Sequence, residues 1–388
     1  MPSSIDCQEL LARLVAFDTT SRNSNLDLIA FIRDFLDGHG IESVLIANDD
    51  GTKANLFASI GPIDRPGIVF SGHTDVVPVD GQDWSCDPFA LTVRDDLLYG
   101  RGTTDMKGFV AAALALVPDL VSRRLERPVH LAFTYDEEVG CKGVPSLLDH
   151  MTAHLPVLPS ACIVGEPTGM QVGNGHKGKA GYRCTVTGRA SHSALNHLGV
   201  NAVEVAAEIV AKLRRMNLDF RANGPFIDGY EPPHCTVSTG VMQGGTALNI
   251  VPSSCSFEFE FRLMPGQDAE RLFAEVHEFS MKELLPAMKA VADEAAIEWH
   301  ELMSYPALGS DGDAPIERLA CSLTDTVVPA KLSFGTEAGH FAKRGVPSIV
   351  CGPGHMIVAH KPDEYVDIQQ LSACSAFLND VVDEISIA

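Results

Sequence analysis

Apolar residues in the first part of the chain follow a helical spacing in some segments and form short continuous runs in others. Helical spacing is found at residues 5–17, 25–40 and 106–124. The short runs, which are rich in β-branched residues, lie at residues 42–47, 55–60, 67–72, 129–135 and 161–166. Alternation of helices with continuously apolar strands predicts α/β layering around a mixed, mostly parallel sheet that is largely buried.

The middle of the chain has a different pattern. The segments at 179–188, 234–245 and 254–263 alternate apolar and polar residues, which is typical of strands with one solvated face. Helical patterns at 201–216 and 268–285 separate them, and 296–302 has the character of a fourth strand. The resulting order, β-α-β-β-α-β, predicts a small α+β domain.

Buried-strand character returns near the end of the chain, at residues 346–354, and a last helix is predicted at 367–385. The two ends of the chain therefore share one style and the middle has another. We predict an α/β domain made of residues 1–179 and 303–388, interrupted by an inserted α+β (βαββαβ) domain of residues 180–302.

Composition narrows the classes of function. The 388 residues carry a formal net charge of −22 and no dense cluster of lysine and arginine, which argues against nucleic acid as a partner. No segment has the length and apolarity of a membrane span, and no signal peptide is recognisable. The ten cysteines form no C-x-x-C pair, so we expect reduced core thiols and a cytoplasmic protein.

One glycine-rich segment imitates a nucleotide-binding loop. Residues 173–180, GNGHKGKA, fit G-x-G-x-x-G and nearly fit the phosphate-loop pattern. Both patterns need a helix immediately afterwards, whereas a strand pattern follows here. Ala180 also occupies the position of the magnesium-binding hydroxyl. We interpret the segment as a glycine-rich hinge between domains and do not expect nucleotide binding.

Polar residues with metal-binding side chains follow several of the predicted strands. His73 and Asp75 come directly after an apolar run, and an aspartate beside an imidazole is the arrangement that orients metal-binding histidines. By itself the pair also fits a buried structural contact. Asp105 stands in a glycine-marked turn before a helical pattern, where it would serve equally well as a helix N-cap.

Further candidates come later in the chain. Glu137 and Glu138 follow the run at 129–135, Glu166 ends the next run, and His360 follows the run at 346–354. Taken singly, Glu166 and His360 are ordinary surface residues. As a set, two histidines and three carboxylates can hold two divalent ions about 3.5–4 Å apart. Zinc suits these ligands, and cobalt or manganese would also fit.

The order of these motifs resembles one known family. H-T-D-V-V-P, G-R-G-x-x-D-M-K-G, D-E-E-x-G, G-E-P-T and A-H-x-P-D-E-Y occur in succession, starting at residues 73, 100, 136, 165 and 359. This succession is similar to that of the di-zinc amidohydrolases and peptidases, which include aminoacylases, carboxypeptidase G and succinyl-diaminopimelate desuccinylase. The resemblance covers essentially the whole chain and implies a catalytic α/β domain with an inserted lid through which subunits often dimerise.

The resemblance implies a role for each ligand. His73 and Glu166 would bind one zinc ion, Glu138 and His360 the other, and Asp105 would bridge them. In relatives the peptide bond after this aspartate is cis, so a cis bond is expected at Asp105–Met106.

The resemblance also implies the catalytic residues. Glu137 would act as general base and acid, activating a metal-bridging hydroxide that attacks an amide carbonyl, and Asp75 would orient His73. His192, in the inserted domain, would reach the neighbouring subunit and stabilise the oxyanion. Asn249 and Arg262 resemble the lid positions that bind a substrate carboxylate, although Arg262 also fits a surface charge at a strand end.

Residues 333–341 and 351–365 point to a subgroup. The T-E-A triplet at Thr336–Glu337–Ala338 and the G-P-G segment before the last motif are most similar to acetylornithine deacetylases. Glu337 would pair with the ammonium of the substrate side chain, with Thr336 beside it. The expected reaction is therefore hydrolysis of N2-acetyl-L-ornithine to acetate and L-ornithine in arginine biosynthesis, by a homodimer.

An alternative interpretation is that the chain is a related amidohydrolase, namely an aminoacylase, a succinyl-diaminopimelate desuccinylase or an acetylcitrulline deacetylase. More distant is a non-catalytic or nucleotide-binding protein on the same scaffold. Such a protein would be expected to lack a metal ligand or the base, and the chain has all of them.

Overall fold

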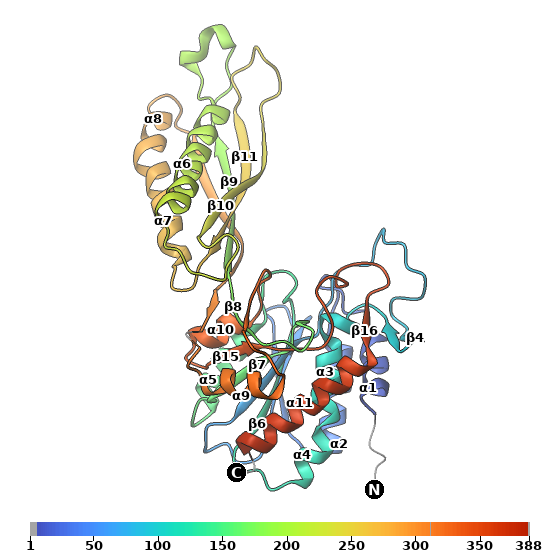
Figure 1. Ribbon diagram of the computed structural model, residues 1–388. Helices are drawn as coiled ribbons and strands as arrows, with labels where there is room; N and C mark the ends of the chain where they lie inside the picture. Colours follow the sequence, from blue (N-terminus) through green and yellow to red (C-terminus); the bar gives the residue numbers. More distant parts are fainter. Residues whose placement is uncertain (1–5, 311, 387–388) are drawn as a thin grey trace. The chain divides into compact units, whose positions relative to one another are not determined.

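The computed structural model describes residues 6–310 and 312–386, and these residues form two compact units (Figure 1). The first unit runs to Gly175 and resumes at Leu308–Leu332 and again from Thr336. The second comprises His176–Ala307 with Ser333–Gly335. The boundaries at 175/176 and 307/308 differ by a few residues from those expected from the sequence.

A nine-stranded sheet forms the centre of the first unit, in the order β1-β2-β6-β3-β7-β15-β8-β13, with β14 paired to β8. The strands are β1 Ser43–Ala47, β2 Ala54–Ile60, β3 Ile68–His73, β6 Val129–Thr134, β7 Ala161–Val164, β8 Gly173–His176, β13 Leu308–Gly309, β14 Ala330–Leu332 and β15 Ser348–Val350. The central strands β6, β3, β7 and β15 are parallel, and β1, β2 and β8 join antiparallel. All residues of β3, β6, β7 and β15 are buried, which explains their unbroken apolar runs.

Helices pack beside this sheet. They are α1 Cys7–Val15, α2 Leu26–Gly38, α3 Gly108–Ala115, α4 Val117–Ser122, α5 Val144–His154, α9 Pro315–Leu323, α10 Ala338–Lys343 and α11 Ile368–Ser386. Helix α3 contacts β3 as well as α1 and α11, and its residues Gly108–Leu114 are all buried, so it is apolar on every side. A separate three-stranded sheet, in the order β16-β5-β4, joins Tyr365–Asp367, Leu97–Tyr99 and Thr92–Arg94.

The single helix expected at residues 106–124 is divided. An irregular turn, η1 Thr103–Lys107, precedes α3, and Asp105 and Met106 within it have non-helical backbone angles. Pro118 stands near the start of α4 and lacks the N–H that would continue the hydrogen bonding of α3. The helix therefore starts later than its apolar spacing predicts, and the chain before it is free to form a loop around Asp105.

The second unit has the expected β-α-β-β-α-β order. Its sheet has the order β10-β11-β9-β12, with antiparallel pairs throughout, and two helical segments, α6 and α7–α8, lie along the chain between its strands. The elements are β9 Gly178–Thr187, η2 Ser193–Leu198, α6 Ala202–Asn223, β10 Thr236–Gly244, β11 Ser254–Leu263, α7 Ala269–Phe279, η3 Ser280–Leu284, α8 Leu285–Lys289 and β12 Ala296–Tyr305. Strand β11 alternates strictly, with Phe257, Phe259 and Phe261 buried, so one face of this sheet carries the core.

Residues 173–180 are extended rather than loop-like. They form β8 and the start of β9, and no helix follows them. The segment therefore lacks the helix N-terminus that a phosphate site requires, as the sequence indicated. It is strand rather than an irregular loop, and the division between the two units falls within it, between Gly175 and His176. Its role as a hinge stays a prediction.

All ten cysteines are unpaired, and seven of them are buried. Within the described part of the chain, no helix combines the length and apolarity needed to cross a membrane. The cytoplasmic location stays a prediction.

A buried histidine in the central sheet makes the stability of the fold dependent on pH. His130 on β6 is 1% exposed, bonds Ser59 Oγ through Nδ1 at 2.8 Å and stacks on Phe57. Burial lowers its pKa from 6.5 to about 4, because the charged imidazolium is poorly solvated there. Between pH 6.5 and about 4, His130 binds a proton in the unfolded chain but stays neutral in the folded protein. Its contribution to stability is therefore complete above pH 6.5 and lost as the pH falls toward 4.

We predict that His130→Leu flattens the acid side of the stability curve. The free energy of unfolding of the metal-free protein, measured by denaturant titration at pH 7 and pH 4.5, should fall less in the variant, by up to about 3 kcal/mol. His154→Leu, at an exposed position of helix α5, is the matched control and should follow the wild type. Equal acid slopes in wild type and His130→Leu would contradict the prediction.

Candidate metal centre

The candidate ligands lie at one edge of the central sheet. His73 is the last residue of β3, Glu138 follows β6, and Glu166 follows β7 after a single residue, Gly165. Because these strands are parallel neighbours, their carboxyl ends meet at the same edge. Gly165 is required there, since a Cβ atom would lie 1.8 Å from the ring of Phe109 on α3.

Asp105 faces both histidines. Its Oδ1 lies 3.0 Å from His73 Nε2, and its Oδ2 lies 3.1 Å from His360 Nε2. Asp105 is 4% exposed. The peptide bond between Asp105 and Met106 is cis, as the resemblance implied. One carboxylate thus offers a separate oxygen to each imidazole, which is the arrangement expected of a bridging ligand.

Two further carboxylates complete the two sides. Glu166 Oε1 lies 3.7 Å from His73 Nε2, and Glu138 Oε2 lies 3.1 Å from His360 Nε2. The other oxygen of Glu138 is buried and has no hydrogen-bond partner among the described residues. A buried carboxylate oxygen without a partner is costly, and a cation would satisfy it. The five candidate ligands are therefore brought together, in two sets that share Asp105.

Glu137 stands within the same cluster. One ligand atom each from His73, Glu137 and Glu166 lie within 4.8 Å of one another, as do those of His73, Asp105 and Glu138. The thiol of Cys141, 1% exposed, donates to Glu137 Oε1 at 3.3 Å. Glu137 is therefore close enough to this edge to exchange a proton with a molecule held there.

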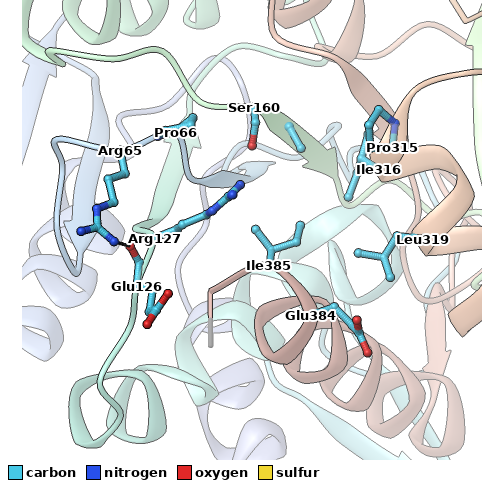
Figure 2. Close-up of a pocket in the computed structure, with 11 residues that line it drawn as sticks. Arg65, Pro66, Glu126, Arg127, Ser160, Pro315, Ile316, Leu319, Glu384 and Ile385 are labelled. Atoms are coloured by element: carbon cyan, nitrogen blue, oxygen red, sulfur yellow. Dashed lines mark hydrogen bonds between the residues drawn. The ribbon is translucent and has the colours of Figure 1, made fainter. Parts of the chain in front are cut away.

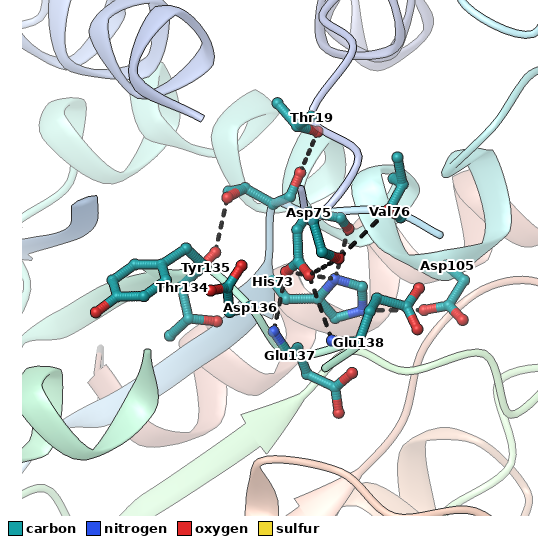
Figure 3. Close-up of polar contacts among 12 residues, drawn as sticks. Thr19, His73, Asp75, Val76, Asp105, Thr134, Tyr135, Asp136, Glu137 and Glu138 are labelled. Atoms are coloured by element: carbon teal, nitrogen blue, oxygen red, sulfur yellow. Dashed lines mark hydrogen bonds and ion pairs between the residues drawn. The ribbon is translucent and has the colours of Figure 1, made fainter. Parts of the chain in front are cut away.

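Asp75 holds this edge together in a different way from the one expected. His73 Nδ1 bonds the main-chain oxygen of Asp75 at 2.9 Å, and the Asp75 carboxylate lies 3.7 Å away. The carboxylate instead accepts the backbone N–H groups of Glu137 at 3.0 Å and Glu138 at 3.3 Å (Figure 3). It also accepts the hydroxyl of Ser21 at 2.6 Å. A carbonyl partner requires a proton on Nδ1, which in the neutral ring leaves Nε2 as a lone pair facing Asp105.

Burial and mutual repulsion raise the pKa of three carboxyl groups in the cluster. For Glu138 the pKa rises to about 7, mainly through burial and then through the charge of Asp105. Burial and neighbouring carboxylates also raise the pKa of Glu137 and Glu166 well above the usual value. A divalent cation at this edge would offset that repulsion.

The pKa values of both histidines are raised as well, which favours the charged form of the ring rather than the neutral one. Burial alone would lower the pKa of His73, but its hydrogen bond with Asp105 and the charge of Glu166 raise it well above 6.5. Hydrogen bonds with Asp105 and Glu138 raise the pKa of His360 to about 10. In the absence of metal, protons on these rings thus take the place that cations would fill.

Two buried cations beside the cluster had no role assigned from the sequence. Arg101 and Lys107 are each 1% exposed, and Lys107 donates to the main-chain oxygens of Leu14 and Phe17. Burial lowers the pKa of Lys107 to about 7. Both residues belong to the G-R-G-x-x-D-M-K-G motif, so their presence in a glycine-marked turn next to Asp105 was the available signal.

The second unit carries three of the candidate residues. His192 and Asn249 lie in exposed neighbouring segments, where Ser193 N donates to the main-chain oxygen of Asn249 at 3.0 Å. His192 Nδ1 accepts the N–H of Ala194, so its proton lies on Nε2. Arg262 lies on β11, half-exposed, with its Nε donating to Glu260 at 2.8 Å. The structure thus brings His192 and Asn249 together, with Arg262 on a separate element.

Thr336 and Glu337 belong to the first unit and are buried. Glu337 is 1% exposed, and its two oxygens accept hydrogen bonds from Thr134 and Ser71. Burial raises its pKa to about 7. Pairing of Glu337 with a substrate ammonium stays a prediction, because in this arrangement both of its oxygens already have protein partners.

A cavity at the other edge of the sheet takes no part in this cluster. It has a volume of about 470 Å³ and lies beside the amino-terminal ends of β3, β6 and β7. Figure 2 shows Arg65, Arg127, Ile316, Leu319 and Ile385 around it. The ligand-type residues lie at the carboxyl ends of the same strands, so the two sites are distinct.

Comparisons with known proteins agree with this geometry. Residues 69–384 match the profile of peptidase family M20/M25/M40. The chain is 35% identical over 375 residues to the acetylornithine deacetylase of Myxococcus xanthus, covering 95% of this chain and 94% of that protein. It is 31% identical over 380 residues to the acetylornithine deacetylase of Proteus mirabilis, covering 96% and 93%.

Solved structures share the fold. An M20 family metallo-carboxypeptidase from Sulfolobus solfataricus superposes with a TM-score of 0.75 at 18% identity, covering 97% of this chain and 98% of that one. A dinuclear metal binding peptidase of the M20 family from Bacillus subtilis superposes with a TM-score of 0.67 at 16% identity, covering 97% and 96%. With the profile spanning most of the sequence and relatives matching nearly end to end, the chain belongs to peptidase family M20/M25/M40.

Proposed function

We propose that this protein hydrolyses N2-acetyl-L-ornithine to acetate and L-ornithine in a metal-dependent reaction that serves arginine biosynthesis. Two full-length relatives at 35% and 31% identity are acetylornithine deacetylases, which supports the substrate. The observation that carries the mechanism is the Asp105 carboxylate, whose oxygens lie 3.0 and 3.1 Å from His73 and His360. Two sets of ligands that share one carboxylate suit a pair of divalent ions.

The side chains fit zinc, and also cobalt or manganese. His73 and Glu166 would hold one ion, and Glu138 and His360 the other, with Asp105 shared between them. The fit rests on the donors themselves: imidazole nitrogens and carboxylate oxygens converge at distances of 3.0–3.7 Å, and Glu138 Oε1 is buried without a partner among the described residues. When bound, the ions would polarise the amide carbonyl and make water more acidic.

Glu137 moves the proton in this proposal. Its main chain is fixed by Asp75 and its carboxylate by the thiol of Cys141. Glu137 takes a proton from the water whose oxygen bonds to the acetyl carbon. As the C–N bond breaks, Glu137 returns that proton to the leaving nitrogen of ornithine. The atoms of one water molecule are thus divided between acetate and the freed amine.

Binding of the remainder of the substrate is assigned to residues outside the metal cluster. Arg262 and Asn249 would bind the α-carboxylate, and Thr336 and Glu337 would recognise the side chain. His192 of a second copy of the chain would stabilise the oxyanion by donating from Nε2. The proton on Nε2, fixed by the Nδ1 contact with Ala194, supports this role for His192.

The proposed homodimer forms through the inserted domain. Strand β10 is an edge strand of its sheet, with Val241 and Met242 more than 40% exposed. Leu195, Leu198, Leu248 and Ile250 are also exposed, in segments that pair with each other through a bridge between His192 and Ile250. An open strand edge beside exposed apolar side chains is a surface that pairing with a second copy would cover.

The proposed function predicts metal-dependent release of ornithine. Protein loaded with zinc or cobalt should release ornithine and acetate from N2-acetyl-L-ornithine, measured by chromatography of both products, and chelator-treated protein should not. N-acetylcitrulline, N-succinyl-diaminopimelate and N-acetylmethionine form the comparison panel. Preferred cleavage of one of these, by protein with both metals bound, would contradict the substrate while leaving the hydrolase mechanism in place.

Glu137→Gln is the control for the mechanism, because it keeps the shape of the side chain and removes its basicity. It should bind metal as the wild type does and lose at least a factor of about 100 in kcat, a loss typical of removing a general base. Metal content by mass spectrometry must accompany the rate measurement, since Glu137 lies near the ligands. Near-normal turnover would remove Glu137 as the base.

The dimer proposal predicts a mass by light scattering of twice the 41.6 kDa of one chain. Val241→Asp combined with Leu248→Asp should shift the protein toward the monomer, because two charges would then be buried at the new interface. Val93→Asp, at a position 59% exposed in the other unit, is the matched control and should leave the mass unchanged. A wild-type mass of a single chain at micromolar concentration would refute the dimer.

A further inference from the structure

Glu364 contacts the loop that presents Asp105. Its side chain is 1% exposed, and Oε1 accepts the backbone N–H groups of both Thr104 and Asp105 at 3.0 Å. The two residues are far apart in sequence, so this contact ties the loop after β15 to the irregular turn η1. Two N–H donors on one carboxylate oxygen fix the direction in which the chain enters the cis peptide bond after Asp105.

Arg101 occupies the other oxygen of Glu364. Arg101 Nη1 lies 2.5 Å from Glu364 Oε2, and both side chains are 1% exposed. The guanidinium also lies over the ring of Trp84, 5.0 Å from its centroid. The pair is therefore enclosed by protein, and neither charge can be solvated without opening the loops around it.

The same guanidinium reaches the segment that carries His360. Arg101 Nη2 donates to Gln82 Oε1 at 2.5 Å, and Gln82 Nε2 donates to the main-chain oxygen of His360 at 2.9 Å. Arg101 Nη1 also lies 3.4 Å from the main-chain oxygen of Lys361. His360 itself has a backbone φ of 63°, an unusual angle for a residue with a side chain, so it needs such support.

These contacts connect Asp105 and His360, two candidate ligands whose Oδ2 and Nε2 atoms lie 3.1 Å apart. Asp105 is held by its main-chain N–H, and His360 by its main-chain oxygen, through one network of Glu364, Arg101 and Gln82. None of the three side chains is among the candidate ligands. The network contacts the main chain of Asp105 and His360 and not their ligand atoms. It can therefore position both residues without itself binding an ion or the substrate.

We infer that Glu364 and Arg101 form a positioning pair that preorganises Asp105 and His360 for metal binding. This inference rests on the proposed metal site but not on the proposed substrate. Partners that orient metal ligands typically affect metal affinity by about 10–100-fold when removed. A merely structural ion pair would instead affect unfolding and leave the metal affinity of the folded protein unchanged.

The experiment is a competition titration of the purified full chain with zinc against a chromophoric chelator. Glu364→Gln keeps an oxygen for the two N–H groups and removes the ion pair. It should raise the Kd of the weaker zinc site at least about 10-fold. Hydrogen exchange of the peptide containing Thr104 and Asp105, measured without metal, should also become faster, since loosening of that loop is the cause of the weaker binding.

Glu317→Gln is the matched control. Glu317 is a buried carboxylate of the same unit, 3% exposed, that accepts hydrogen bonds from Asn174 and Ser310 rather than from the loops of the cluster. Its variant should lower thermal stability without changing either zinc Kd. A Kd for Glu364→Gln equal to that of the wild type would overturn the inference, as would an equal rise in Glu317→Gln.

A second variant covers the case in which Glu364→Gln does not fold. Gln82→Met keeps the length of a half-buried side chain and removes the link between Arg101 and the main-chain oxygen of His360. It should also weaken zinc binding, and an unchanged Kd would count against the network.

Zinc stoichiometry of the wild type, measured in the same titration, tests the metal site itself: binding of no zinc would overturn both the site and the inference. Failure to cleave acetylornithine would touch only the substrate.

Discussion

The crowding of carboxylates at one buried edge of a parallel sheet is the constraint on which the rest of this structure depends. Asp105, Glu138 and Glu166 lie there within reach of two histidines, with Glu137 beside them. Burying several negative charges together is unfavourable unless positive charge accompanies them. The raised pKa values of the glutamates and of both histidines reflect this unfavourable burial of charge, and divalent cations would offset it.

The architecture distributes the task of holding these groups among many segments. Parallel strands bring His73, Glu138 and Glu166 to the same edge, and α3 packs so closely behind them that Gly165 has no room for a side chain. Asp75 fixes the backbone of the two adjacent glutamates. The two adjacent glutamates after β6 have different surroundings: Glu138 faces His360, and Glu137 lies beside the thiol of Cys141, where the proposed mechanism uses it to carry a proton.

The layering could be predicted from the sequence, and so could the gathering of ligand-type side chains at strand ends, because both signals are local. Apolar runs and alternating runs distinguish buried strands from half-solvated ones, and the β-α-β-β-α-β order of the inserted domain follows from them. Ligand-type residues at successive strand ends are equally visible. The interruptions of the helix between η1 and α3 and between α3 and α4 were not predicted, because the apolar spacing continues across both. Only Pro118 signals the second interruption.

What could not be predicted depends on contacts between distant segments. Glu364 was given no role from the sequence, yet it accepts the N–H of a residue 259 positions earlier in the chain. Asp75 was expected to orient His73 with its carboxylate, but the main-chain oxygen makes that contact. Neither result follows from residue type or spacing, since each requires knowing which backbone groups two loops bring together.

The most direct measurement is anomalous diffraction from crystals of the zinc-loaded protein. The account predicts two zinc positions about 3.5–4 Å apart. One should lie beside His73 and Glu166, the other beside Glu138 and His360, with an oxygen of Asp105 bound to each and Glu137 bound to neither. A single zinc position, or Glu137 as a direct ligand in place of Glu166, would contradict the shared carboxylate and the separate base on which the account depends.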